Sequence, residues 1–77
     1  MKRNPFLNSV NISKRRGRRA AVILVVDLLG KVYGAEFNYL QSFPYNLHGS
    51  DAYHAADNAL DYILEAITSL EWSYALV

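Results

Sequence analysis

The sequence has no cysteine, two prolines and four scattered glycines among its 77 residues. Without cysteine, disulfide bonds and thiolate metal sites are excluded, so a domain this small needs another source of stability, such as self-association or a partner. The glycines are too far apart to form a loop that cradles a phosphate. No set of nucleophile, base and paired carboxylates is evident either. We therefore expect no enzyme activity, no cofactor and no metal site.

Acidic side chains are missing from the first part of the chain, and basic ones are nearly missing from the rest. Residues 1–19 hold seven bases and no acid, a net charge of +7, whereas residues 20–77 hold one base and seven acids, a net charge of −6. The first part suits phosphate or an acidic protein surface, and the second suits a basic surface, including one that normally holds nucleic acid. Alternatively, the two parts neutralise each other within one subunit or between copies. This division predicts a basic N-terminal arm or edge hairpin at 1–19 and a compact sheet-plus-helix domain at 20–77.

Long hydrophobic runs are also lacking. Residues 20–29 are apolar except at Asp27, which gives about half the length that a membrane-spanning helix needs. No small-residue cleavage site follows this run, which argues against a signal peptide. We expect a cytoplasmic protein that does not bind a membrane.

Three segments have the pattern of β-strands. Residues 20–28 are apolar on both faces and rich in valine and isoleucine, which predicts a central strand. Residues 32–42 and 71–77 alternate in the manner of further strands, and residues 7–13 could add an edge strand that leaves 14–19 as an exposed basic turn. Phe37 and Trp72 are expected to fill the core of this sheet.

Residues 50–70 predict an amphipathic helix, which follows a loop at 43–49 and is capped by Ser50 or Asp51. Its apolar face contains Ala52, Ala56, Ala59, Leu60, Ile63, Ile67 and Leu70, and the small residues in its first half allow a close approach to a sheet. The predicted fold class is α+β: a single small domain with a three- or four-stranded, mostly antiparallel sheet packed on one amphipathic helix, in the order ββαβ or βββαβ.

The polar face of this helix is the first candidate binding surface. It repeats a carboxylate every four residues, and neighbouring tyrosines are of a type enriched where proteins dock. The predicted partner-binding residues are Asp57, Asp61, Glu65, Tyr53 and Tyr62. The alternative is an ordinary solvated helix face with tyrosines packed at the edge of the core.

A cluster of bases at residues 14–19 is the second candidate. Guanidinium groups bind phosphates with two parallel hydrogen bonds, so arginine is the residue expected in a phosphate-binding patch. The predicted nucleic-acid-binding residues are Arg15, Arg16, Arg18 and Arg19. The alternative is a solubilising arm or a partner for salt bridges between molecules.

The stretch from Tyr33 to Ile67 combines a predicted strand, the entry Gly49-Ser50-Asp51 and the alanine-rich helix AYHAADNALDYILEAI. This succession of elements resembles that of HicB-type antitoxin domains, over less than half of the chain. The proline-glycine loop of that family is matched only at Phe43-Pro44, and no separate DNA-binding segment follows. The resemblance implies an antitoxin-like protein, and no residue role is carried over from it.

These features predict a non-enzymatic interaction protein that docks on a protein or a protein–nucleic acid complex. A phage- or mobile-element-type inhibitor of a nucleic-acid-processing complex would have this character. The alternatives are a small nucleic-acid-binding module that uses the arginine cluster and an antitoxin-like protein. We also expect that an open edge strand could support a homodimer.

Overall fold

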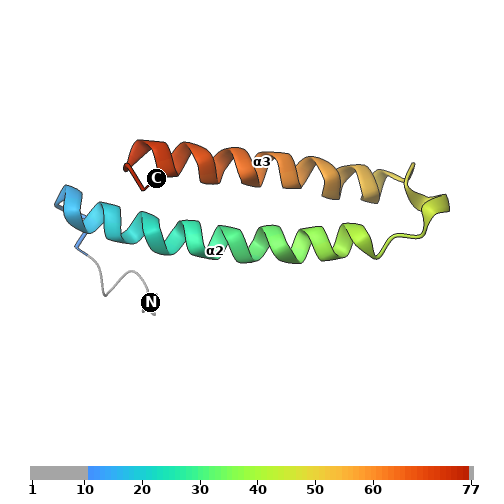
Figure 1. Ribbon diagram of the computed structural model, residues 1–77, viewed down its shortest axis with the longest axis horizontal. Coiled ribbons are helices and arrows are strands. Elements are labelled where there is room, and N and C mark those ends of the chain that lie inside the picture. Colours follow the sequence, from blue (N-terminus) through green and yellow to red (C-terminus); the bar gives the residue numbers. More distant parts are fainter. Residues whose placement is uncertain (1–10, 77) are drawn as a thin grey trace, which may run out of the picture.

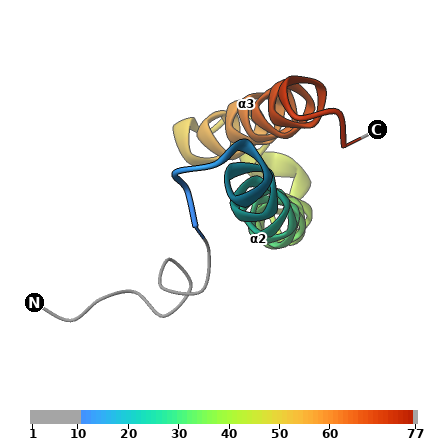
Figure 2. The ribbon, with the colours of Figure 1, turned by 90° about the vertical axis from the view of Figure 1, so that its left-hand side faces the viewer.

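Two long helices lie side by side in opposite directions and form a helical hairpin (Figure 1). The computed structural model describes residues 11–76. Helix α2 spans Arg15–Gln41, a short 3-10 turn (η1) spans Tyr45–Leu47, and helix α3 spans Asp51–Ser73. Seen from the end of the hairpin where α2 begins and α3 ends, α3 stays beside α2 along its length (Figure 2).

The predicted α+β fold is wrong, because residues 11–76 contain no β-strand. Residues 20–28 and 32–42 belong to α2, apart from Ser42, which follows that helix, and Glu71–Ser73 are the last turn of α3. The strand in the resemblance to HicB-type domains is therefore helical, and no open strand edge is present in the described residues to support a homodimer.

Helical spacing explains why residues 20–42 do not form strands. Side chains three or four residues apart share one face of a helix, whereas in a strand a three-residue step places them on opposite faces. Five of the buried or half-buried residues of α2 follow the helical spacing and share one face, and we call them the inner row: Val22, Val26, Leu29, Tyr33 and Leu40. Valine and isoleucine cost a helix only a few tenths of a kcal/mol each, so this packing outweighs their preference for strands.

The basic segment is helical rather than an exposed turn. Helix α2 begins at Arg15 and runs through residues 19 and 20 without a break, so the arginine cluster forms its first turns. Asn11–Ser13 form a turn in which the Asn11 side chain accepts a hydrogen bond from the Ser13 backbone at 3.0 Å. The rest of the optional edge strand, residues 7–10, lies outside the described residues.

The helix predicted at 50–70 is confirmed as α3. The Ser50 hydroxyl accepts a hydrogen bond from the Tyr53 backbone N–H at 3.2 Å, which is the expected N-terminal cap. On the predicted apolar face, Ala56 and Leu60 are buried and four other positions are half-buried, whereas Ala52 is exposed. The loop at 43–49 is also confirmed, with η1 inside it.

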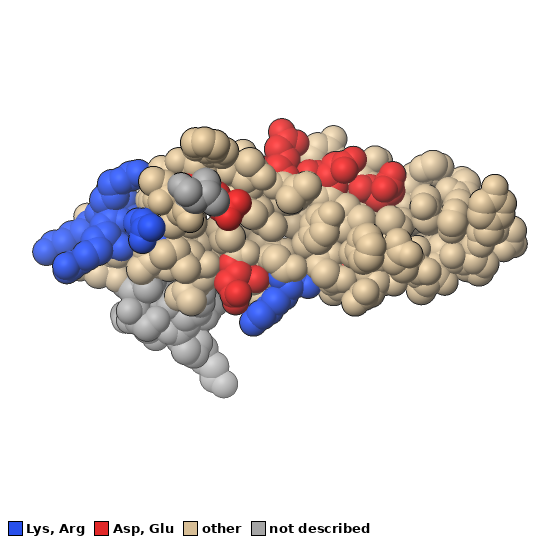
Figure 3. Space-filling model, viewed as in Figure 1, with Lys and Arg blue, Asp and Glu red and all other residues tan. Residues whose placement is uncertain are grey.

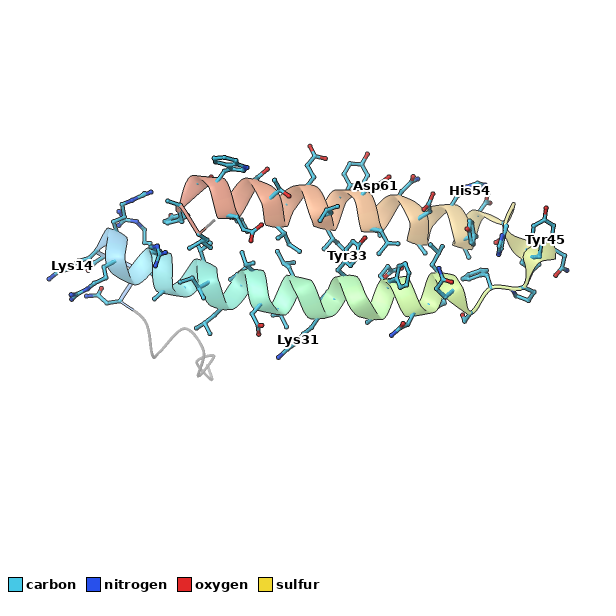
Figure 4. The ribbon with its side chains drawn as sticks, in the orientation of Figure 1. Lys14, Lys31, Tyr33, Tyr45, His54 and Asp61 are labelled. Atoms are coloured by element: carbon cyan, nitrogen blue, oxygen red, sulfur yellow. The ribbon has the colours of Figure 1, made fainter. Side chains whose placement is uncertain are left out.

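The core of the hairpin is small and lies toward its closed end, where the loop joins the helices. Leu40, Ala56 and Leu60 are buried, and Tyr33 and Tyr53 pack against them. In Figure 4, Tyr33 lies between the two helices. Most other apolar side chains keep substantial exposure, which follows from the geometry of two helices that can cover only one face of each other.

Neither helix within residues 11–76 combines the length and the apolar character needed to span a bilayer.

Two glycines in the middle of α2 provide a test of the fold. A Cβ atom added at Gly30 or Gly34 would meet nothing within 4 Å. Each of the variants Gly30→Ala and Gly34→Ala should raise the free energy of unfolding by up to about 1 kcal/mol, because alanine favours a helix interior by that amount. Urea unfolding followed by far-UV circular dichroism measures the change.

The control is Gly17→Ala, where the added Cβ would collide with the backbone carbonyl of Asn11. This variant should gain less stability than the other two or lose it. A loss of stability at Gly30 or Gly34 would contradict their open surroundings.

Candidate functional site

The outer side of α3 carries three exposed carboxylates, Asp57, Asp61 and Glu65, which we call the acidic row. Figure 3 shows acidic side chains gathered along this edge of the molecule, and in Figure 4 Asp61 points away from α2. The ion pair within residues 11–76 is that of Lys31 with Asp27, at 3.4 Å. No described cation therefore neutralises the acidic row. Like charges at this spacing destabilise a helix by a few tenths of a kcal/mol per pair. Among the described residues, the row is therefore a surface of unopposed negative charge.

Two large aromatic side chains of α3 are also exposed. Tyr62 is 72% exposed and Trp72 is 74% exposed. Trp72 lies seven residues after Glu65, two turns along the helix, so it continues the side of the acidic row. The prediction that Phe37 and Trp72 fill the core is wrong, since Phe37 is 45% exposed as well. Extending the predicted helix past Leu70 would have placed Trp72 on the polar face.

Tyr53 has different surroundings from the other predicted partner-binding residues. Its ring is half-buried, stacks on His48 at 4.5 Å between centroids and meets Phe43 edge-on at 5.6 Å. Phe43 in turn meets Tyr39 edge-on at 5.0 Å. Such aromatic pairs contribute about 0.5–1.5 kcal/mol each beyond the area that they bury. Tyr53 therefore belongs to an aromatic cluster that closes the hairpin, one helical turn before Asp57, the first carboxylate of the acidic row.

His48, Ser50 and Asp51 are close in sequence, but they do not form a catalytic set. Each of them stabilises the loop or the start of α3. Ser50 caps α3, and His48 stacks on Tyr53 with its Nε2 atom 3.3 Å from the carbonyl oxygen of Phe43. Asp51 lies in the first turn of α3, where a negative charge favours the helix dipole. Within residues 11–76 no three side chains of histidine or carboxylate type gather closely enough to hold a metal ion.

Arg15 and Arg19 join the two helices at the open end of the hairpin. The Arg15 guanidinium donates to the carbonyl oxygen of Ser73 at 2.9 Å, and the Arg19 Nε atom donates to that of Tyr74 at 3.2 Å. Arg15 also lies over the Tyr74 ring, 4.7 Å from its centroid. Cations near the last carbonyls of a helix interact favourably with its dipole. Two of the four predicted nucleic-acid-binding arginines thus hold the end of α3.

The backbone turn that ends α3 leaves two carbonyl groups available to these arginines. Ala75 adopts a left-handed φ of 53°, and the backbone N–H of Leu76 donates to the carbonyl of Glu71 at 2.8 Å. This left-handed turn reverses the chain after the helix, as in a Schellman motif. It leaves the carbonyl groups of Ser73 and Tyr74 free to accept from α2.

Arg16 and Arg18 differ from Arg15 and Arg19. Arg18 donates to the carbonyl oxygen of Ile12 at 3.2 Å, next to its own helix, and Arg16 makes no side-chain hydrogen bond within residues 11–76. Figure 3 shows most of the basic side chains clustered at one end of the molecule, away from the acidic row. The described arginines contact carbonyl oxygens and not the acidic row, so the two charged surfaces remain separate.

No family model, no curated protein and no solved structure matches this chain.

The arginine contacts at the open end can be tested by stability. Arg15→Ala and Arg19→Ala should each lower the free energy of unfolding by about 1 kcal/mol, because each removes a charge-assisted hydrogen bond between the helices. Arg16→Ala removes the same charge from the same helix and should change stability by less than about 0.5 kcal/mol. Thermal and urea unfolding of the three variants make the comparison, and equal losses in all three would refute this role.

Proposed function

We propose that this chain is a non-enzymatic docking protein that presents the acidic row to a basic surface of a macromolecular partner. The carrying observation is that Asp57, Asp61 and Glu65 are exposed and meet no described cation. A helix holds them in a line with steps of about 6 Å, so little conformational entropy is lost when they bind. Tyr62 and Trp72 supply exposed aromatic surface on the same helix, and such residues dominate binding energy at protein interfaces.

A basic surface that matches such a row is one that normally holds nucleic acid. Proteins that bind nucleic acid use lysine and arginine to neutralise phosphates, and a line of carboxylates competes for the same cations. Occupation of that surface would inhibit the partner, which is the action expected of a phage- or mobile-element-type inhibitor. An antitoxin that blocks a basic toxin would work in the same way. We expect this encounter in the cytoplasm.

The test compares two variants that raise the net charge by the same amount. Asp57→Asn with Asp61→Asn removes two charges from the acidic row. Asn38→Lys with Gln41→Lys adds two positive charges at exposed positions of α2. The tagged wild-type chain and both variants are used to capture proteins from a bacterial lysate, and a short DNA duplex is then added as a competitor.

We expect a nucleic-acid-binding protein that is retained by the wild type and by the α2 variant, released by DNA, and lost with the acidic-row variant. The acidic-row variant should stay folded, because the removal of like charges four residues apart favours the helix by a few tenths of a kcal/mol. Equal retention by the acidic-row variant, or retention that DNA does not affect, would argue against the proposal.

A second candidate function is nucleic-acid binding at the open end. The observation that favours it is the cluster of basic side chains there, in which Arg16 has no described hydrogen-bond partner (Figure 3). Arg15 and Arg19 could contact phosphate only in addition to their bonds to α3. The available contacts would be few and would read backbone charge rather than base sequence.

Fluorescence anisotropy with labelled duplex DNA and single-stranded RNA, repeated across salt concentrations, tests this candidate. Binding through Arg16 and Arg18 should give a log–log salt slope of about −0.9 per phosphate contact on duplex DNA, and the slope should fall by about two such units in Arg16→Ala with Arg18→Ala. Absence of binding at low salt would exclude this function. A slope that the double variant leaves unchanged would exclude these two residues.

A further inference from the structure

Helix α2 carries a second line of apolar side chains, in addition to the inner row that packs on α3. We call this line the outer row: Ala21, Leu24, Leu28, Val32, Ala35 and Tyr39. Its steps are of three and four residues, so it forms a continuous stripe over five turns of the helix. Leu24, Leu28, Val32 and Tyr39 are 40%, 58%, 42% and 50% exposed.

The hairpin cannot cover the outer row by itself. The outer row is centred about 120° around the helix from the inner row, and Val32 lies about 100° from Tyr33. Helix α3 packs on the inner row, so the outer row keeps substantial exposure, except at Ala21, which is half-buried. An apolar stripe of this length on a rigid helix indicates a contact surface.

The small core of the hairpin indicates that this contact contributes to folding. Leu40, Ala56 and Leu60 are the buried hydrophobic residues among residues 11–76, and they lie toward the closed end. A fully buried leucine contributes about 1.5–3 kcal/mol, so these residues supply little against the entropy lost by ordering two long helices. Small chains without disulfides or metals commonly add core by pairing with a second copy.

We propose that the outer row is the contact between two copies of this chain, which pack with their α2 helices antiparallel to form a four-helix bundle. The side-chain sizes along the row carry this assignment. If two copies are aligned antiparallel about residues 29–30, Ala21 faces Tyr39 of the second copy and Leu24 faces Ala35, so that a small residue meets a large one in each pair. Leu28 faces Val32 at the centre. Facing positions that alternate large and small residues fill the space between helices.

A parallel alignment does not give this fit. Each residue would then face itself, so that the alanine pairs leave gaps and the tyrosine pair is crowded. Both defects destabilise a packed interface. The outer row of one copy therefore fits the outer row of a second copy that runs in the opposite direction, as an interface with two-fold symmetry requires.

Charges beside the row favour the same alignment. Asp27 and Lys31 form an ion pair at 3.4 Å within α2, and both are exposed. They lie on one edge of the outer row, and in an antiparallel pair with two-fold symmetry this edge meets the same edge of the second copy. An axis near residues 29–30 brings Asp27 of each copy beside Lys31 of the other. The two ion pairs then join into one network of alternating charge.

Sedimentation velocity of the wild type and two matched variants tests the proposal. The wild type should sediment as a dimer with twice the 8.7 kDa mass of the chain. Leu28→Glu places two carboxylates in each interface and should weaken dimerisation by about 100-fold or more. Ile23→Glu changes another exposed side chain of α2, one that is 44% exposed and lies outside the outer row, and should change dimerisation by less than about threefold. A wild type that remains monomeric at about 100 μM, or equal effects of the two variants, would overturn the proposal.

Disulfide trapping tests the alignment and does not depend on how Leu28→Glu folds. Because the natural chain has no cysteine, single-site variants report one contact each. On exposure to dissolved oxygen, a mixture of Leu24→Cys and Ala35→Cys chains should form the mixed disulfide in preference to either symmetric one. Ile23→Cys mixed with Ala35→Cys is the control and should give little mixed product. A preference for symmetric disulfides, or no preference, would refute the antiparallel pair. This inference is separate from the proposed function, because it concerns α2 and leaves the acidic row exposed.

Discussion

The packing of α2 against α3 along one narrow seam is the constraint on which the rest of this structure depends. Two helices can shield only the sides that face each other, and here the shielded set is the inner row of α2 and the matching face of α3. Leu40, Ala56 and Leu60 become buried, and the remaining apolar side chains keep much of their exposure. The surfaces that could bind another molecule are therefore set by what this seam leaves uncovered.

The two ends of the hairpin are held by different interactions. At the closed end, Tyr53 stacks on His48 and meets Phe43, so aromatic contacts fix the loop against α3. At the open end, Arg15 and Arg19 donate to the carbonyl oxygens of Ser73 and Tyr74, where α3 ends. The arginines thereby offset the negative end of the α3 dipole, and the carboxylates of the acidic row meet no cation within residues 11–76. Figure 3 shows the resulting arrangement, with most of the basic side chains at one end of the molecule and the acidic row elsewhere.

The error in the predicted fold has a definite physical origin. A strand that is buried on both faces has apolar residues at nearly every position, and residues 20–29 have this pattern. Helix α2 gives the same pattern because it carries two apolar rows about 120° apart, so that few positions remain for polar residues. The predicted helix at 50–70 was correct because it has one apolar face and a serine cap, which no strand would share. Trp72 was misplaced because the predicted helix ended one turn too early.

The sequence by itself determined the features that depend on local spacing. These are the segregation of charge, the Ser50 cap, the apolar face of α3 and the regular carboxylates of the acidic row, since helical periodicity alone places such residues relative to one another. Tertiary structure decided the roles that depend on which element lies beside a residue. Arg15 reaches a carbonyl group 58 residues away, and Arg19 reaches one 55 residues away. The burial of Tyr53 and the exposure of the outer row were likewise decided only when α3 packed on one side of α2, because an apolar residue on a helix is shielded only where another element covers it.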